Sequence, residues 1–435
     1  MNPLAKELNN IITEINPYIY EMLSEVGKNL FFPKGILSQT AEAKEKAYRF
    51  NATIGMATEK GAPMYLPSIM KWINLPPEKS ITYAPAYGIP ELRIVWKEFM
   101  YKKNPSLNGK ETSLPVVTHA ITHGLSVVAD MWIDPGDIIV LPDKMWGNYR
   151  LIFEVRKGAK IVNYEFFDKN KKFNINAFQN ILKEQAKERN KLVIILNFPN
   201  NPTGYSPTIS EAEQIKEVIL NIAENNTNIV VVMDDAYFGL VYEEGILKES
   251  LFSYLAQEHP RILSIKLDAA TKEDFVWGLR VGFLTYAIAS DSSPHPLYKA
   301  LEKKSAGAIR GSISNSNHLG QQILLSALKA PDYEKEKREK FEILKERAEK
   351  VKIALSKASY EDIWESYPFN SGYFMCLKIK NVDAEKLRKY LLDKYGIGVI
   401  AINKTDIRIA FSSVEKEDIE ELFEKISQAI KELQQ

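Results

Sequence analysis

Short runs rich in valine and isoleucine recur between about residues 115 and 290, and amphipathic helical patterns separate them. Runs that are apolar at nearly every position are typical of strands buried on both faces. Their alternation with helices predicts an α/β fold, with a mostly parallel seven-stranded sheet covered by helices. The seven runs are PVVTHA from Pro115, DIIVLPD from Asp137, AKIVNYEF from Ala159, LVIILNF from Leu192, NIVVVMDD from Asn228, RILSIKLD from Arg261 and GFLTYA from Gly282.

The helix between the fourth and fifth runs shows this pattern clearly. Ser210 and Glu213 have the spacing of a capping box, in which each side chain bonds to the other residue's backbone N–H. The sequence therefore predicts a helix that begins at Ser210. Its apolar stripe consists of Ile215, Val218, Ile219 and Ile222.

The pattern changes after about residue 315. Residues 331–357 are rich in Glu and Lys, which is more typical of a solvated helix between domains than of a binding surface. Short apolar runs and two further helical patterns follow, and they predict a smaller α+β domain. We therefore expect residues 65–315 to form a large domain and residues 316–435 a small domain. Residues 1–64 are expected to add an N-terminal helix, an arm and a loop to the small domain.

The composition excludes several classes of protein. A length of 435 residues favours two domains, and 45% hydrophobic with 26% charged residues is typical of globular proteins. The 57 basic and 56 acidic residues give a net charge of +1, so no overall field favours nucleic acid or a membrane surface. No run is apolar enough over a sufficient length to cross a bilayer. We therefore expect neither nucleic acid nor a membrane as a partner.

The single cysteine and the first residues predict a cytoplasmic protein. Cys376 lies in the apolar run YFMCLKI, where it is typical of a small core residue, and one cysteine cannot form a disulfide within a chain. The first 18 residues contain no continuous apolar stretch, so they predict an amphipathic helix rather than a signal peptide. The apolar positions of this helix are Leu4, Leu8, Ile11, Ile12 and Ile15.

Polar side chains follow three of the predicted strands at their carboxyl ends, where open α/β sheets bind ligands. Asn201 lies in the turn NFPNNPTG, Asp234 begins DDAYFG, and Lys272 lies in DAATKEDF. A carboxylate at the end of a buried strand is costly unless it is paired, so Asp234 needs a cationic or donor partner. A protonated pyridine nitrogen would be such a partner.

Lys272 and Arg280 are eight residues apart in a segment poor in other cations. A lysine amine attacks a carbonyl only when it is neutral, and burial beside a cation lowers its pKa. Arg280 can hold a phosphate at the far end of the same molecule through forked hydrogen bonds. This spacing suits a cofactor with an aldehyde and a phosphate. Two solvated charges are the simpler alternative, and this segment alone does not exclude them.

The chain resembles the class I and II aminotransferases, a family in the fold type I superfamily of pyridoxal 5′-phosphate (PLP) enzymes with aspartate aminotransferase as its best-known member. The motifs that carry the resemblance occur in the family's order over nearly the whole chain. They are NATIGMATEKGAPMYLPSI from Asn51, YAPAYGIPELR from Tyr83, MWGNY from Met145, NPTG from Asn201, DDAY from Asp234, Lys272 followed by GLRVG from Gly278, and DIRIAFS with Arg408. The resemblance implies a PLP transferase of fold type I, whose large domain binds PLP and whose loop from Asn51 gives access to the substrate.

The resemblance also implies roles for single residues. Lys272 would bind the cofactor covalently and, once released, act as the base that moves a proton from the substrate Cα. Asp234 would keep the pyridine nitrogen of PLP protonated. Tyr237 and Asn201 would donate hydrogen bonds to the phenolic oxygen of the ring, and Trp146 would lie against its face.

The phosphate and the substrate would be held by separate groups. The phosphate would lie at the turn THAIT, at a helix start, with Arg280 and with Tyr83 from a second subunit. Arg408 would bind the α-carboxylate of the substrate, and Gly55 would let the backbone close over it. The resemblance thus implies a homodimer with shared active sites. The residues of THAIT expected at the phosphate are Ala120, Ile121 and Thr122.

Three positions depart from the family's pattern. The family usually has glycine where Ala120 stands, and a hydroxyl residue three positions before the lysine, where this chain has Ala269. One phosphate contact is therefore expected to be missing. Tyr149 stands where the aspartate branch has histidine, so the group beside Asp234 is expected to differ.

Arg310 is the candidate for recognising the substrate side chain. The segment IRGSISN, from Ile309, resembles one in the aspartate branch whose arginine reaches across the dimer to the distal carboxylate of aspartate or glutamate. A surface or interface arginine is the alternative, because extra residues separate this segment from Arg280 relative to that branch.

The predicted function is an aminotransferase that moves an amino group between aspartate or an aromatic amino acid and 2-oxoglutarate in a ping-pong cycle. A PLP-dependent lyase or decarboxylase is the alternative, because it would share every cofactor residue. A PLP-sensing regulator fits poorly, since the residues before the access loop are too few and not basic enough for a DNA-binding domain. No metal is expected, because the histidines lack ligand spacing and His119 and His123 flank the predicted phosphate turn.

Overall fold

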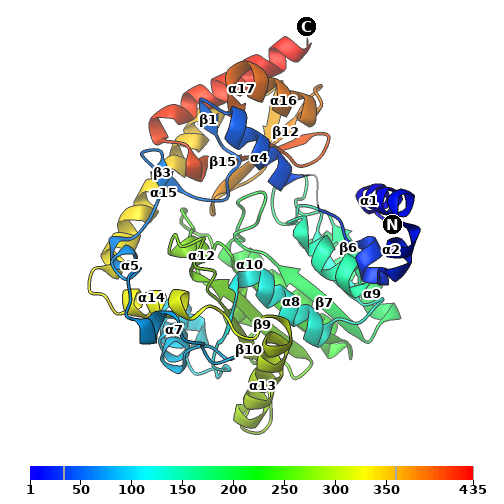
Figure 1. Cartoon of the computed structure of the whole chain (residues 1–435), viewed down its shortest axis with the longest axis vertical. Helices are drawn as coiled ribbons and strands as arrows, with labels where there is room; N and C mark the ends of the chain where they lie inside the picture. The colour runs from blue at the N-terminus through cyan, green and yellow to red at the C-terminus, as the bar shows by residue number, and fades with distance from the viewer. Residues whose placement is uncertain (33–34, 358–359, 435) are drawn as a thin grey trace.

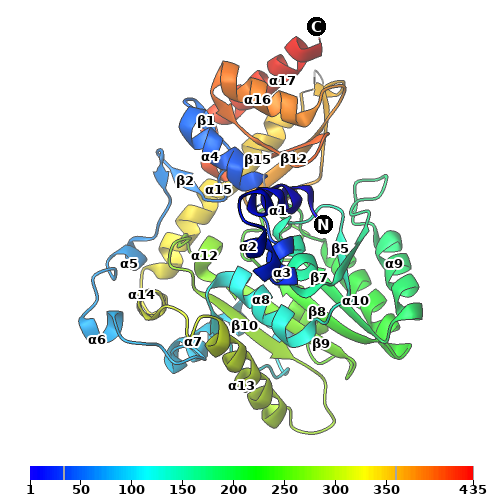
Figure 2. The same cartoon turned by 45° about the vertical axis from the view of Figure 1, so that its right-hand side comes forward.

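The computed structural model describes residues 1–32, 35–357 and 360–434, and two sheets organise it (Figure 1). One sheet has seven strands and lies in the middle of the chain, and the other has four strands and lies near the C-terminus. We call these sheets, each with its helices, the large domain and the small domain. Helix α15 (Tyr333–Leu355) runs from the large domain into the small domain (Figure 2).

The seven predicted runs form the seven strands of the large sheet. Its order is β4-β10-β9-β8-β7-β5-β6. Four neighbouring pairs are parallel, whereas β10 is antiparallel to both β4 and β9. The prediction of a mostly parallel seven-stranded sheet is therefore confirmed. The strands are β4 (Val116–Thr118), β5 (Ile138–Pro142), β6 (Lys160–Tyr164), β7 (Lys191–Leu196), β8 (Asn228–Asp234), β9 (Ile262–Ala269) and β10 (Gly282–Ala287).

Helices cover both faces of this sheet. Successive residues of a strand point to opposite sides, so a strand that is apolar at every position presents an apolar surface on each face for helices to pack against. In β7, Leu192 and Ile194 pack in one cluster with buried residues of α9 and α10, whereas Val193 and Ile195 pack in another with residues of α8 and α13. The first face carries α9 (Ile175–Glu188), α10 (Ile209–Glu224) and α11 (Leu251–Leu255), and the second carries α8 (Ala120–Trp132), the π-helical η2 (Arg150–Val155) and α13 (His295–Ser312).

The N-terminus of α10 differs from the prediction. Thr208 and Glu211 form the capping box, so the predicted pair of Ser210 and Glu213 is wrong. Glu211 is buried, and its carboxylate also accepts hydrogen bonds from the Tyr205 hydroxyl at 2.7 Å and from a backbone N–H at 3.0 Å, which fixes this register. The predicted apolar stripe is confirmed, since Ile215, Val218, Ile219 and Ile222 are all buried.

The small domain is an antiparallel sheet in the order β11-β12-β15-β14 with helices packed on it. An N-terminal strand, β1 (Phe50–Asn51), pairs with β13 (Ile397–Gly398), and α4 (Ile36–Lys46) lies beside it. The remaining elements are β11 (Trp364–Ser366), β12 (Phe374–Ile379), β14 (Ile400–Ala401), β15 (Asp406–Ala410), α16 (Ala384–Tyr395) and α17 (Ile419–Gln434). Cys376, in β12, is a buried core residue as predicted.

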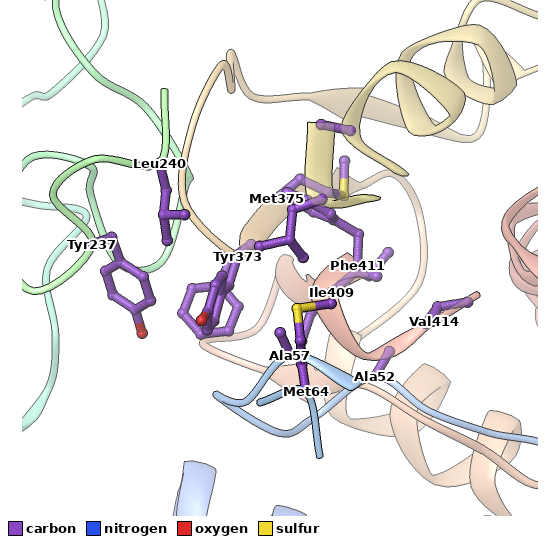
Figure 3. Close-up of a cluster of buried hydrophobic side chains, with 14 of the residues drawn as sticks. Ala52, Ala57, Met64, Tyr237, Leu240, Tyr373, Met375, Ile409, Phe411 and Val414 are labelled. Atoms are coloured by element: carbon purple, nitrogen blue, oxygen red, sulfur yellow. The ribbon is translucent and has the colours of Figure 1, made fainter. Parts of the chain in front are cut away.

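One hydrophobic cluster joins the two domains (Figure 3). Tyr237 and Leu240 follow strand β8 of the large domain, and they lie beside Tyr373 and Met375 of the small domain. This cluster contains residues from both sheets, so it does not mark where one domain ends and the other begins. The predicted domain boundaries after residues 64 and 315 therefore stay predictions. The same cluster includes Ala52, Ala57, Met64, Ile409, Phe411 and Val414.

The N-terminal residues form a helical arm. The predicted amphipathic helix is α1 (Pro3–Ile15), and α2 (Pro17–Met22) and α3 (Glu25–Asn29) follow it. Leu8, Ile11 and Ile15, on the predicted apolar stripe, are exposed within one chain. The remaining α-helices and β-strands of the described residues are β2 (Thr58–Glu59), β3 (Ala62–Pro63), α5 (Pro67–Met70), α6 (Pro77–Ser80), α7 (Pro90–Lys103), α12 (Ala270–Glu273) and α14 (His318–Leu328).

Helix α15 confirms the prediction of a helix between domains, but one of its faces is buried rather than solvated. Leu344, Arg347 and Val351 lie on that face. None of the helices in the described part of the chain has an apolar stretch of the length needed to span a membrane.

Candidate active site

A cavity of about 340 Å³ lies where β7, β8 and β9 end and α8 begins. The small domain closes it on the opposite side with residues of β12 and β15. Parallel strands place their carboxyl ends at one edge of a sheet, which explains why segments far apart in sequence meet here. Eleven of the thirteen residues predicted for the site line this cavity: Gly55, Ala120, Ile121, Thr122, Trp146, Asn201, Asp234, Tyr237, Lys272, Arg280 and Arg408.

Lys272 lies in the short helix α12, directly after strand β9, which is an interior strand of the large sheet. Its Nζ donates a hydrogen bond to the carbonyl oxygen of Gly55 at 2.7 Å and lies 5.4 Å from the ring centre of Tyr237. Burial, followed by the nearby charges of Arg280 and Arg408, lowers the pKa of Lys272 to about 7. A large fraction of this amine is therefore neutral at neutral pH, as a nucleophile that attacks an aldehyde must be.

Asp234 is the last residue of β8 and is buried. The hydroxyl of Tyr149 donates to its Oδ2 at 2.5 Å, and the backbone N–H of Ala236 donates to its Oδ1 at 3.3 Å. Burial raises the pKa of Asp234 to about 6, because these bonds only partly offset the loss of water. No lysine or arginine of the described residues forms an ion pair with it. A cationic ring nitrogen in the cavity would supply the missing partner.

Tyr149 is fully buried and forms an edge-to-face contact with Trp146, with ring centres 5.5 Å apart. Burial, with the charge of Asp234, raises the pKa of Tyr149 well above its ordinary value. The phenol therefore stays protonated and donates to Asp234. Tyr149 stands where the aspartate branch has histidine, as the sequence indicates. The structure adds that its hydroxyl donates to Asp234.

The first turn of α8 forms an anion-binding end of the cavity. Ala120 has a left-handed backbone with φ of 60°, the conformation that glycine adopts most easily and the one expected where the family has glycine. A Cβ on Gly282 would lie 2.8 Å from Ala120 Cα, so glycine there lets β10 approach this turn. Backbone N–H groups of a first helical turn have no partner within the helix, and Ala120, Ile121 and Thr122 occupy that turn.

Arg280 adds positive charge at the same end. Its guanidinium makes one long hydrogen bond, from Nη1 to the carbonyl oxygen of Trp277 at 3.4 Å, and burial lowers its pKa. Burial and then Arg280 also lower the pKa of His119, which immediately precedes α8. The positive groups at this end suit a phosphate.

Arg408 lies on β15 at the small-domain side and is buried. Its Nη1 donates to Asn201 Oδ1 at 3.2 Å, and its Nη2 donates to a backbone carbonyl at 3.1 Å. Its Nε has no hydrogen-bond partner, and the guanidinium lies 4.1 Å from the ring centre of Phe374. A buried cation with an unused donor and no carboxylate partner among the described residues suits the carboxylate of a substrate.

Two predicted residues, Tyr83 and Arg310, lie outside the cavity. The side chain of Tyr83 is 90% exposed. Arg310 is on the surface at the end of α13, where its Nη1 donates to Ser314 Oγ at 2.6 Å. Both residues are predicted to act on the site of a second subunit, and for one chain that role stays a prediction.

Five further residues line the cavity: Tyr149, Asn197, Ala236, Thr271 and Phe374. Asn197 connects two of the strand ends, because its Nδ2 donates to the Asp234 carbonyl and its Oδ1 accepts from the backbone N–H of Asn201. Asn197 directly follows β7, and a polar residue at the end of a strand is the sequence pattern that could have identified it as a site residue. Thr271 has a buried hydroxyl without a hydrogen-bond partner in the structure. Phe374 comes from the small domain and has no such signal in the sequence.

The residues of the cavity fit PLP on chemical grounds. Asp234 needs a cation, the α8 turn and Arg280 suit a phosphate, and the Lys272 amine suits an aldehyde. All three groups occur in PLP when its pyridine nitrogen is protonated. The orphaned Thr271 hydroxyl and Arg408 Nε are further polar atoms in this cavity that a bound ligand can satisfy.

The chain matches known proteins over most of its length. The family model "Aminotransferase class I and II" matches residues 70–426. A probable aspartate/prephenate aminotransferase from Aquifex aeolicus is 27% identical over 381 residues, covering 85% of this chain and 88% of that protein. An aspartate aminotransferase from Pyrococcus horikoshii is 25% identical over 356 residues, covering 80% and 83%. The crystal structure of an aminotransferase from Anaerococcus prevotii has a TM-score of 0.83 at 24% identity, covering 94% of this chain and 98% of that one.

The Anaerococcus prevotii structure has the same fold, and all three proteins are aminotransferases by name, which favours transamination over the lyase or decarboxylase alternative. The match to the family model includes both large sheets and every residue that lines the cavity except Gly55. The chain therefore belongs to the class I and II aminotransferases, and it is a PLP-dependent transaminase of fold type I.

Proposed function

We propose that this enzyme moves an amino group between L-aspartate or an aromatic L-amino acid and 2-oxoglutarate, in a ping-pong cycle. The observation that carries the proposal is the position of the Lys272 amine, with its lowered pKa, in one cavity with two arginines. Neither Arg280 nor Arg408 has a carboxylate partner in the described part of the chain. One arginine suits the cofactor phosphate, and the other suits the carboxylate of an amino acid.

The residues of the cavity divide the chemistry among them. When PLP is bound, its ring withdraws electrons from the substrate and so makes the Cα proton acidic. Lys272 holds the cofactor at first and, once free, takes this proton from Cα. Asp234, kept in place by Tyr149, holds the proton on the pyridine nitrogen.

Asn201 and Tyr237 would hold and orient the cofactor ring through hydrogen bonds. Because Asn201 Oδ1 accepts from Arg408, its amide nitrogen is free to donate into the cavity. Trp146, which also lines the cavity, would pack against the ring. These contacts keep the reacting atoms of the substrate near Lys272, and such positioning lowers the barrier for proton transfer.

The proposed substrates rest on the relatives and on Arg310. Relatives of this chain are named aspartate or aspartate/prephenate aminotransferases, which supports a dicarboxylate in at least one half of the cycle. The cavity of one chain offers Arg408 for the α-carboxylate, and its lining includes no further arginine or lysine for a distal carboxylate. Arg310 of a second copy is the proposed partner for that group, together with Tyr83 for the phosphate.

The half-reactions test this proposal. The chain loaded with PLP is mixed with aspartate, tyrosine, phenylalanine or alanine alone, while the yellow absorbance of the cofactor is recorded. We expect aspartate or an aromatic amino acid to bleach the absorbance and release an equal amount of 2-oxo acid, and 2-oxoglutarate to restore it. Recovery of the absorbance without an added 2-oxo acid would indicate a lyase and contradict the proposal. The Lys272→Ala variant is the matched control and should not bleach at a comparable rate.

Mixed dimers test whether Arg310 acts across a subunit boundary. Lys272→Ala and Arg310→Ala chains are each expected to be almost inactive with aspartate. If Arg310 serves the partner's site, a hybrid of the two variants contains one site with both residues intact, and activity returns when the chains are mixed and reassembled. Failure of every hybrid to regain activity would refute the shared site while leaving the aminotransferase reaction untouched.

A further inference from the structure

One face of helix α15 holds polar side chains that contact two segments next to the active site. Tyr333, Lys337, Lys340 and Arg347 are spaced by four, three and seven residues, which puts them on the same side of a helix. Tyr333 and Arg347 are each 1% exposed, and the side chains of Lys337 and Lys340 are each 17% exposed. This face, which we call the polar face of α15, is therefore buried although the rest of the helix is strongly charged.

The N-terminal half of the polar face contacts the two residues that follow Lys272. Lys337 Nζ lies 2.7 Å from Glu273 Oε1 and 3.1 Å from Asp274 Oδ1. The hydroxyl of Tyr333 donates a short hydrogen bond to Asp274 Oδ1. Both carboxylates are buried, so these contacts fix the peptide segment that carries Lys272 against α15.

Two more features show that the chain is built around the Glu273 carboxylate. Lys103, at the end of α7, lies 3.0 Å from both of its oxygens. Gly239 has φ of 84°, and a Cβ there would lie 2.7 Å from Glu273 Oε1, so only glycine leaves room for this group. Burial alone would raise the pKa of Glu273, but Lys103 and Lys337 lower this pKa to about 2. The acid is therefore ionised and paired.

The C-terminal half of the polar face contacts the access loop. Lys340 Nζ lies 2.6 Å from Glu59 Oε2, and Arg347 Nη1 donates to the carbonyl oxygen of Thr58 at 2.8 Å. Thr58 and Glu59 form strand β2, three and four residues after Gly55. Gly55 is the residue whose carbonyl oxygen accepts the hydrogen bond from Lys272 Nζ. One rigid helix face is thus bonded to the segments on both sides of that contact.

We propose that Lys337 and Lys340 are positioning residues, and that the polar face of α15 sets the place of the Lys272 amine relative to the Gly55 loop. Neither lysine lines the cavity, so each acts through a neighbour. Lys337 also neutralises the two carboxylates that directly follow Lys272 in the chain, so its removal leaves their negative charge without this partner. The inference rests on the proposed role of Lys272.

The experiment compares three variants with a matched control in the PLP-loaded enzyme. Lys337→Met removes the charge that contacts Glu273 and Asp274, Tyr333→Phe removes only a hydroxyl, and Lys340→Met removes the contact with the access loop. Lys350→Met is the control, because Lys350 lies on the same helix but pairs with Glu420 of α17 at 3.0 Å. The measurements are kcat, KM for the amino donor, the pH at which the bound cofactor changes colour, and the melting temperature without cofactor.

We expect Lys337→Met to lower kcat about tenfold while KM changes less than about threefold, since misplaced catalytic groups lose rate more than binding. The loss of a cation beside two carboxylates should also move the pH of the colour change upward, by about half a pH unit. Tyr333→Phe and Lys340→Met should each lower kcat about fivefold, and Lys340→Met should leave the colour change in place. Lys350→Met should stay within twofold of the unaltered enzyme in kcat and KM.

If Lys337 only stabilises the fold, its replacement should lower the melting temperature and leave kcat, KM and the pH of the colour change as they are. The inference is overturned if Lys337→Met melts earlier but keeps its kcat within twofold and its colour change at the original pH. If Lys337→Met does not fold, Tyr333→Phe decides by its kcat alone. Failure of the unaltered chain to bleach with any amino donor would instead refute the proposed function, so the two failures are distinguishable.

Discussion

Replacing Tyr149 by phenylalanine removes one hydroxyl from the active site without changing the shape of the core. That hydroxyl donates to Asp234 Oδ2 at 2.5 Å, and both side chains are fully enclosed. The carboxylate would keep only the longer bond from Ala236 N–H at 3.3 Å. A hydrogen bond to a charged group contributes about 1.5 to 3 kcal/mol, and about 1.4 kcal/mol corresponds to one pH unit. The pKa of Asp234, already raised by burial to about 6, should therefore rise by about one to two further pH units.

The consequence is a weaker cofactor site at neutral pH. Asp234 must be ionised to pair with a protonated pyridine nitrogen, so PLP affinity falls as the pH drops through the pKa of this carboxyl group. In the unaltered protein we expect that fall near pH 6, and in Tyr149→Phe between about pH 7 and 8. The assay is equilibrium binding of PLP to the cofactor-free protein, followed by absorbance over this pH range.

Two control variants separate this effect from a loss of packing. Tyr149→His restores a hydrogen-bond donor to Asp234, so the pH at which PLP affinity falls should move back toward 6. Tyr286→Phe removes another buried hydroxyl, which bonds to Ser305 and does not line the cavity, and should leave the pH dependence unchanged. If Tyr149→Phe binds PLP with the same pH dependence as the unaltered chain, the Tyr149 hydroxyl does not hold Asp234 in its charged form.

Three further predictions concern separate parts of the molecule. In the cofactor-free protein, the rate at which Lys272 reacts with PLP should rise as the pH rises through about 7, since the amine loses its proton there; a rise centred near pH 10 would show an unperturbed lysine. Arg408→Lys should raise KM for the amino donor by about 30-fold or more, because a forked pair of hydrogen bonds becomes a single point charge, and steady-state kinetics with kcat as the reference measures this. Thr208→Ala should lower the free energy of unfolding by about 1 kcal/mol in a urea titration with unchanged activity, whereas Ser210→Ala, outside the capping box, should have a much smaller effect.

The sequence predicts the strands of the large domain better than it predicts how they pair. The seven apolar runs are visible because a strand buried on both faces is apolar at nearly every position. Periodicity carries no information about neighbours, so the insertion of antiparallel β10 between β4 and β9 could not be predicted. The N-terminus of α10 illustrates a local ambiguity. Thr208 with Glu211 and Ser210 with Glu213 have the same spacing, and only the burial of Glu211 beside Tyr205 selects the first pair.

Much of the candidate site could be predicted because its residues follow strands. Asn201, Asp234 and Lys272 meet for the topological reason that parallel strands end at a common edge. Phe374 reaches the cavity from the small domain, and its place depends on how the two domains pack, which no local pattern records. Tyr83 shows a different limit, since a side chain that is 90% exposed in one chain acquires its predicted role only from a second copy.

The balance of charge in the cavity supports both proposed roles of Lys272, as a nucleophile and as a base. Its amine lies with Arg280 and Arg408 around it, and after burial these two cations lower its pKa the most. Without bound anions a large fraction of the amine is therefore neutral near pH 7, which favours attack on an aldehyde. A phosphate on Arg280 and a substrate carboxylate on Arg408 would neutralise both cations and so raise the proton affinity of the amine. In the proposed cycle, Lys272 would therefore be a stronger base at the stage in which it accepts the Cα proton.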